Sequence, residues 1–524
     1  MRKLLLASAA VLGATGGLAH AQTAPSASQG QYAAPYAAGP AANNNNNTWG
    51  IANTVSGSAA AGGVSNYGSY GANYNAVPTP GTVVIRLNGR VEADVVAGFT
   101  SADKSTNAAG AYTGYKVNPV QIDSYMRLYP GFDGLSANGI RYGAAIELRE
   151  NFLGANPAQQ TAGNTAALQA AAPGIQSPSA TSSGQTVMVR RAFTYLATDQ
   201  AGLVRLGQTD GVVGLYDNCL FTTQCWDAGV GIQQQGAWGT TPTNATGGGA
   251  TYPWLSQAGA EYVNQKVVYL TPQFFGFDFG VQYAPGQGNG LQNSTGGNAN
   301  GAAVCGLPSD NCSSTTTGGT SNRWINQWGI GARYEHTFGA VDAKAYGYYE
   351  GSGKENVDVN GYTAAVPGTA AFRAGATANN IHYQNLGFYQ AGAALTAFGT
   401  TAAISYIGGH VNGQLALDPV GGVNTNAWIA GLTYVNGPIT VGGNFGIVDT
   451  QGAVQLTGTS QRREVVGAFG GNYKVAPGVN LVLEYDYITR HQGGYDFNAG
   501  ALGTAGLTAD AKAQGVLFST VLTW

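Results

Sequence analysis

The sequence predicts an all-β fold, a 16-stranded antiparallel transmembrane β-barrel, and three observations support it. The chain starts with an export signal, it is poor in charge and rich in Gly and Tyr, and segments of alternating polarity follow one another from about residue 82 to Trp524. Inside lipid every backbone polar group must be hydrogen-bonded, so only helices and closed barrels can span a membrane. The composition leaves the barrel as the favoured solution.

Residues 1–21 have the features of a cleaved secretory signal peptide. Arg2 and Lys3 supply the positive charge at the start, an apolar stretch runs from Leu4 to Leu18, and residues 19–21 (Ala-His-Ala) form a small-x-small cleavage site. The apolar stretch is shorter than the ~20 residues that a membrane-spanning helix needs. We therefore expect export, with residues 1–21 removed.

The composition excludes several classes of protein. Charged residues make up 9% of the chain, against about 25% in soluble domains. The formal net charge is −3, whereas a nucleic-acid-binding protein would be basic. After the signal no run of about 18 apolar residues predicts a spanning helix. An exported, aromatic chain without such a helix favours a barrel, with a soluble secreted β-protein as the alternative.

Residues 22–80 differ from the rest of the chain. They consist mainly of Ala, Gly, Ser, Asn, Gln, Pro and Tyr, and no charged side chain occurs between Lys3 and Arg86. Such a segment buries too little apolar surface to offset the entropy of ordering it. We expect a disordered N-terminal extension at 22–80 and a barrel at 81–524.

From residue 82 the side chains alternate as strands require. In residues 82–99, Val83, Ile85 and Leu87 alternate with charged or polar residues, and residues 140–149 repeat the pattern. A Lys or Arg facing lipid costs roughly 2–4 kcal/mol at mid-membrane. We therefore expect the charged row to face a wet lumen and the aliphatic row to face lipid.

Read in order, the chain contains sixteen strand candidates, an even number as bacterial barrels require. They are residues 82–99, 120–130, 139–150, 185–197, 202–209, 264–271, 276–285, 322–338, 340–350, 382–397, 400–410, 424–435, 439–449, 462–475, 478–490 and 512–524. Short connections, such as 398–399, alternate with long ones, such as 210–263. Short turns on one rim and long loops on the other are typical of outer-membrane barrels.

The last strand carries a recognisable assembly signal. Trp524, Leu522 and Phe518 lie on one face of an alternating strand that ends the chain. This arrangement resembles the C-terminal signal that the barrel-assembly machinery reads. We therefore expect the chain to lie in the lipid of a bacterial outer membrane after interaction with that machinery.

Several segments resemble the general trimeric porins of bacteria. Residues 190–196 (Arg-Arg-Ala-Phe-Thr-Tyr-Leu) and 202–208 (Gly-Leu-Val-Arg-Leu-Gly-Gln) resemble the strand pair that precedes the porin constriction loop, and residues 266–277 resemble the next pair. The resemblance covers about 82–524. It implies a homotrimer of water-filled pores for ions and small hydrophilic solutes, with a third long loop, here 210–263, folded into each pore.

In that family, acidic residues of the loop face a ladder of arginines on the barrel wall. The loop candidates here are Asp210, Asp217 and Asp227. The lumen-facing wall candidates are Arg86, Arg90, Arg127, Arg141, Arg149 and Arg190. Alternation allows only one of the adjacent Arg190 and Arg191 to face the lumen, and the motif favours Arg190. Each arginine could instead balance a nearby acid in a structural ion pair, and the loop acids could face solvent.

The four cysteines form two local pairs, Cys219 with Cys225 and Cys305 with Cys312. In an oxidising periplasm two disulfides are the natural interpretation. A zinc site is the alternative, but these spacings are uncommon for zinc. We expect neither a metal nor a cofactor.

Other functions are predicted less well by the sequence. No nucleophile elbow, zinc-protease motif or phosphate-binding loop accompanies the histidines, so we do not expect an enzyme. A substrate-selective channel, for example for sugars, and a structural or adhesive surface barrel remain open. By alternation Tyr125, Tyr129, Tyr346 and Tyr348 could line the lumen, and a sugar channel would use such aromatic side chains.

Overall fold

A computed structural model describes most of the predicted barrel. The described residues are 80–100, 120–151, 188–198, 200–209, 211–212, 265–272, 274–286, 324–354, 384–411, 418, 421–452, 461–476, 478–496, 501–502 and 509–524. The predicted signal peptide and the predicted N-terminal extension up to residue 79 lie outside them. So do the four cysteines and all but two residues of the 210–263 loop.

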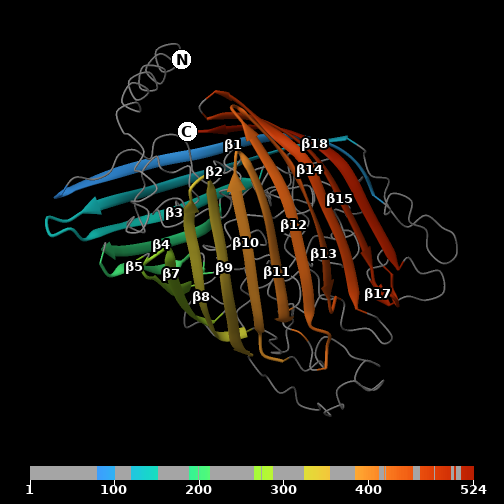
Figure 1. The fold of residues 1–524 in the computed structure, drawn as a ribbon, viewed down its shortest axis with the longest axis horizontal. Coiled ribbons are helices and arrows are strands. Elements are labelled where there is room, and N and C mark those ends of the chain that lie inside the picture. The colour runs from blue at the N-terminus through green and yellow to red at the C-terminus, as the bar shows by residue number, and fades with distance from the viewer. Residues whose placement is uncertain are drawn as a thin grey trace, which may run out of the picture.

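Sixteen strands form one closed antiparallel barrel (Figure 1), as predicted. They are β1 (Thr82–Thr100), β2 (Val120–Leu135), β3 (Arg141–Asn151), β4 (Met188–Thr198), β5 (Gly202–Gln208), β6 (Gln265–Leu270), β7 (Phe277–Gly286), β8 (Trp324–Phe338), β9 (Val341–Lys354), β10 (Gly387–Ala397), β11 (Thr400–His410), β12 (Thr425–Asn436), β13 (Ile439–Thr450), β14 (Arg462–Ala476), β15 (Val479–His491) and β18 (Asp510–Thr523). Two short strands, β16 (Tyr495–Asp496) and β17 (Ala501–Leu502), pair separately. In the described part of the chain no helix is long and apolar enough to cross a membrane.

The outer face of the barrel is apolar. As the alternation predicted, the aliphatic row of β1 points outward and its polar row points inward. On β1 the side chain of Ile85 is 82% exposed, whereas Asp94 is 4% exposed. On β18 Phe518 and Leu522 are exposed, whereas Ser519 between them is buried. An exposed aliphatic row is the reverse of a soluble sandwich, in which the apolar row is inside. The structure therefore favours a barrel surrounded by lipid.

The inner face is less uniformly polar than we expected. On β11 to β14 the inward positions include Ile407, Ile429, Val448 and Val466, each fully buried. Outward positions on the same strands, such as Leu432, are also apolar. In this part of the barrel polarity alone does not distinguish the two faces.

The short turns have the backbone that tight hairpins need. Phe398 (φ 51°) and Gly399 (φ 77°) connect β10 to β11, and both are left-handed. Two-residue hairpins of type I′ require positive φ at both positions because this twist matches that of the strands. The predicted two-residue turn at 398–399 is confirmed.

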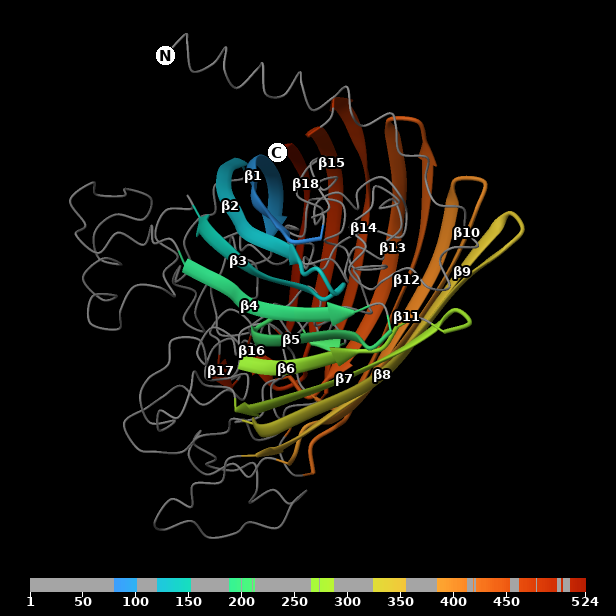
Figure 2. The same cartoon turned by 90° about the vertical axis from the view of Figure 1, so that its left-hand side faces the viewer.

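The barrel closes where β18 pairs with β1, and Figure 2 shows the two strands side by side. The backbones of Gly89 and Trp524 exchange two hydrogen bonds of 3.1 Å. A Cβ atom at Gly89 would overlap the indole ring of Trp524. The ring of the last residue therefore fits against β1 because Gly89 has no side chain.

Candidate pore constriction

The loop that follows β5 turns into the barrel at its start. Val212 is fully buried, and its backbone N–H donates a hydrogen bond of 2.5 Å to Oε1 of Gln282 on β7. A Cβ atom at Gly331 on β8 would lie 3.2 Å from Cγ1 of Val212. In the barrel β6 separates β5 from β7. The chain therefore passes β6 on the inner side and reaches the inner wall at β7 and β8.

The predicted acidic side of the constriction is not seen directly. Asp210, Asp217 and Asp227 lie outside the described residues. What the described residues establish is the inward direction of the chain at Val212, a few positions before Asp217.

Three of the predicted wall arginines occupy one row of the sheet. Arg90 is paired in register with Arg127, and Arg127 with Arg149, across β1, β2 and β3. Directly opposite residues of antiparallel strands share a face of the sheet. Arg90 is also four positions before Asp94 on the same strand, whose buried side chain faces the interior of the barrel. The side chains of these three arginines and of Arg86 and Arg190 lie outside the described set.

Arg141 is the predicted wall arginine whose side chain the structure describes. It is the first residue of β3, next to the short β2–β3 turn, and it is half-buried. At about 3.3 Å per residue, it lies roughly 26 Å along β3 from Arg149. The structure thus separates Arg141 from the Arg90–Arg127–Arg149 row and assigns it to the rim with the short turns.

The argument that only one of Arg190 and Arg191 can face the lumen assumed unbroken alternation, and the register of β4 breaks at these residues. The pairing of β3 with β4 shifts at a β-bulge, from Glu147–Arg191 to Leu148–Val189. Two adjacent residues then oppose one residue, Glu147, which is inward and buried. Phe193, two positions after Arg191 on the same strand, is buried inside the barrel, so its face of β4 is the inner face.

Ion pairs elsewhere on the inner wall were missed by the sequence analysis. Nη2 of Arg333 lies 3.0 Å from Oδ2 of Asp278, and Nζ of Lys344 lies 3.5 Å from Oε1 of Glu335, across β7 to β9. On the far side Nε of Arg490 lies 2.7 Å from Oε1 of Glu464. Alternation within each strand would have identified these residues as inward, but their pairing depends on register between strands.

The inward tyrosines are confirmed in three of the four predicted cases. Tyr129, Tyr346 and Tyr348 are all buried within the barrel. The hydroxyl of Tyr346 accepts a hydrogen bond of 2.8 Å from Gln390 and lies 2.9 Å from Oγ of Ser405, and that of Tyr348 donates to Glu350. The hydroxyls of Tyr346 and Tyr348 are thus already hydrogen-bonded to the barrel wall, which does not favour a sugar-binding track of aromatic side chains. The side chain of Tyr125 lies outside the described set.

Hydrogen bonds join the segments at the ends of β11, β13 and β15. The N–H of Val423 donates to Oε1 of Gln451 (2.7 Å), and Nε of Arg462 donates to Oε1 of Gln492 (2.9 Å). Nε2 of Gln492 donates to the carbonyl of Gln451 (3.2 Å). In the same region burial raises the pKa of the Asp418 carboxyl well above its ordinary value. Within the described residues no cluster of side chains is suited to a metal ion.

The chain is similar to proteins of known family and structure. A family model described as Gram-negative porin matches residues 7–493. Among solved structures, the trimer form of OmpT, an outer membrane protein of Vibrio cholerae, is 12% identical over 84% of this chain and 100% of its own, with a TM-score of 0.42. A mutant of the Rhodobacter blastica porin is 11% identical over 84% of this chain and 100% of its own, with a TM-score of 0.39. A comparison with curated protein sequences finds no match. The chain belongs to the Gram-negative porin family and is an outer-membrane porin channel.

Proposed function

We propose that this porin forms a water-filled pore for passive diffusion of ions and small hydrophilic solutes, narrowed by the 210–263 loop. The observation that carries the proposal is the position of Val212 against the inner wall at Gln282. A loop that started towards the outside would not reach that wall. The ion-paired inner positions on β7 to β9 fit a hydrated interior.

The proposed constriction has two charged sides. The row of Arg90, Arg127 and Arg149 would form the basic side, joined by Arg190 and Arg191 at the bulge. Asp217 and Asp227 of the loop would form the acidic side. Opposite charges across a narrow, low-dielectric opening create a transverse field, which orders water and sorts ions by charge.

Single-channel recording in planar bilayers tests this proposal. The wild-type protein should conduct linearly, and D217N/D227N should shift the reversal potential in a salt gradient towards anions. R90Q/R127Q/R149Q should shift it towards cations. We expect shifts on the order of 10 mV, against the ~59 mV that a tenfold gradient sets as the limit for a monovalent ion.

The matched control removes a charge from the outer surface. Lys512 is exposed on β18, near the ring of Tyr487, and K512Q should leave the reversal potential unchanged. Unchanged selectivity in both lumenal variants would contradict the proposed constriction. A saturable block by a sugar would instead indicate a substrate-selective channel, and absence of conductance would indicate a structural or adhesive barrel.

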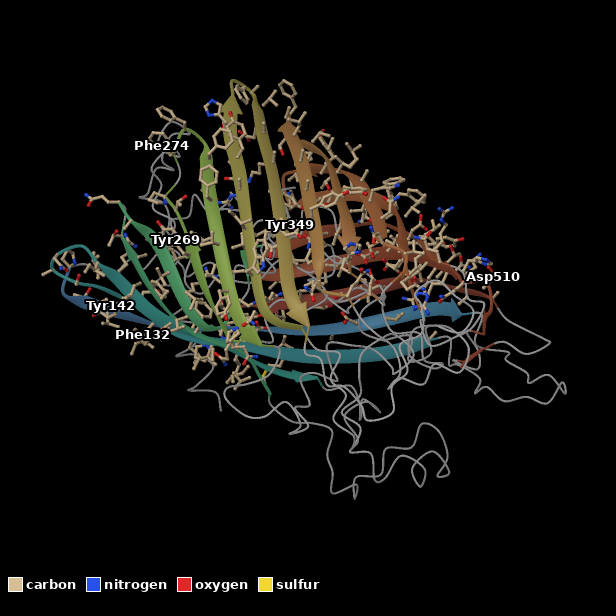
Figure 3. All side chains as sticks on the ribbon, turned by 90° about the horizontal axis from the view of Figure 1, so that it is seen from below. Phe132, Tyr142, Tyr269, Phe274, Tyr349 and Asp510 are labelled. Carbon is tan, nitrogen blue, oxygen red and sulfur yellow. The ribbon has the colours of Figure 1, made fainter. Side chains whose placement is uncertain are left out.

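We also propose that the pore assembles as a homotrimer through the face of β1 to β5. On these strands the exposed large apolar side chains that the structure describes are aliphatic, apart from Phe132. On β6 to β15 they include many aromatic residues, such as Trp328, Tyr349 and Tyr434. Figure 3 shows Tyr349 and Phe132 on different sides of the barrel. Aromatic girdles mark contact with the lipid interface, so a face that lacks them favours contact with protein.

Biogenesis is part of the same proposal. Residues 1–21 would be cleaved on export, and Trp524, Leu522 and Phe518 would be read by the barrel-assembly machinery. Phe518 and Leu522 on β18 and Trp524 directly after it are all exposed, which supports this interpretation. Disulfides between Cys219 and Cys225 and between Cys305 and Cys312 remain predictions that non-reducing mass mapping would check.

A further inference from the structure

Val212 contacts the inner wall at Gln282, a side chain whose amide makes few other hydrogen bonds. Gln282 is 4% exposed, and its register neighbours are the fully buried Val268 on β6 and Gly329 on β8. Its Oε1 accepts the hydrogen bond from Val212, whereas its Nε2 has no hydrogen-bond partner within the described structure. Burying an amide among such neighbours is unfavourable unless it is hydrogen-bonded. The hydrogen bond from Val212 therefore offsets part of the free-energy cost of burying the Gln282 amide.

Beside Gln282, two glycines make room for the loop. A Cβ atom at Gly331 would lie 3.1 Å from Cδ2 of Tyr348 and 3.2 Å from Cγ1 of Val212. A Cβ atom at Gly329 would overlap the hydroxyl end of the same tyrosine. The ring of Tyr348 therefore lies close over β8, held by the bond from its hydroxyl to Glu350. Val212 packs at the remaining space above Gly331.

We propose that Gln282 and Gly331 act as positioning residues that hold the 210–263 loop at Val212, and thereby set the cross-section of the pore. The inference rests on the proposed function, in which this loop forms the constriction. The hydrogen bond fixes where the backbone of Val212 lies along the barrel wall. The missing side chain at Gly331 determines how closely the chain approaches that wall. Downstream residues of the loop then start from a defined point inside the barrel.

Two variants test the two halves of this contact in the full-length protein. Q282L keeps the volume of the side chain but removes the acceptor, and G331V fills the space that Val212 occupies. G347V is the matched control, because Gly347 on the adjacent strand β9 is exposed and a Cβ atom there meets no atom within 4 Å. Hydrogen exchange of the Val212 amide measures the contact, and single-channel recording measures the pore.

We expect exchange at Val212 to become roughly two- to tenfold faster in Q282L, as loss of one hydrogen bond predicts. Both Q282L and G331V should show higher conductance with more frequent fluctuations, whereas G347V should match the wild type. Unchanged exchange in Q282L would overturn the contact. Faster exchange with wild-type conductance would overturn its control of the pore. A wild-type protein that does not conduct would refute the proposed function, while the exchange measurement would still report on the contact.

Discussion

At the scale of single residues, Trp524 and Gly89 join the two ends of the barrel sheet. The ring of Trp524 lies where a side chain at position 89 would be. Replacing Gly89 by Val should therefore displace the ring and weaken the closing strand pair. Overpacking of this kind costs about 1–3 kcal/mol, which would appear as a lower urea midpoint for unfolding from detergent micelles.

The double variant G89V/W524A distinguishes a local clash from a general effect of valine in β1. If the ring is what the valine meets, removing the ring should recover part of the loss, and a double-mutant cycle would show coupling. Additive losses would contradict the contact. G347V again serves as the control for adding a side chain to a strand glycine.

At the scale of elements, each strand has one face in lipid and one inside, and the cost of a charge should depend on both face and depth. Leu432 is exposed on the outer face of β12, well inside the strand, whereas Phe398 is 86% exposed in the β10–β11 turn. An arginine at the bilayer midplane costs about 2–4 kcal/mol, falling to about 0–1 kcal/mol near the interface. L432R should therefore be much less stable than F398R in lipid vesicles, and equal stability would contradict a lipid-facing β12.

At the scale of the whole molecule, the uneven distribution of outer aromatics predicts where the subunits meet. Ile85 on β1 and Leu395 on β10 are both exposed and both lie near the rim with the short turns. If β1 to β5 form the subunit contact, I85R should dissociate the trimer, whereas L395R should leave it intact. Light scattering of the detergent-solubilised proteins, or gel mobility without heating, measures this. A trimer that survives I85R but not L395R would contradict the proposed face.

Much of the barrel follows from local patterns. A period of two in residues 82–99 and 140–149 identified the lipid face, and the Phe398–Gly399 pair marked a two-residue turn. The constriction was harder to predict from the sequence. Gln282 contacts Val212 across 70 positions, and no local pattern connects them. Alternation also could not predict the bulge at Arg190 and Arg191. An inserted residue reverses which face the side chains occupy on one side of it.

The sequence by itself determined the sixteen strands, their antiparallel order, the alternation of short and long connections and the family. These properties depend on side-chain polarity at spacings of two and on turn residues, both of which are local. Only the tertiary structure decided that Val212 lies on the inner wall, that Arg90, Arg127 and Arg149 form one row, and that Trp524 packs over Gly89. These contacts depend on register between strands and on the path of a loop, which are set when the barrel closes.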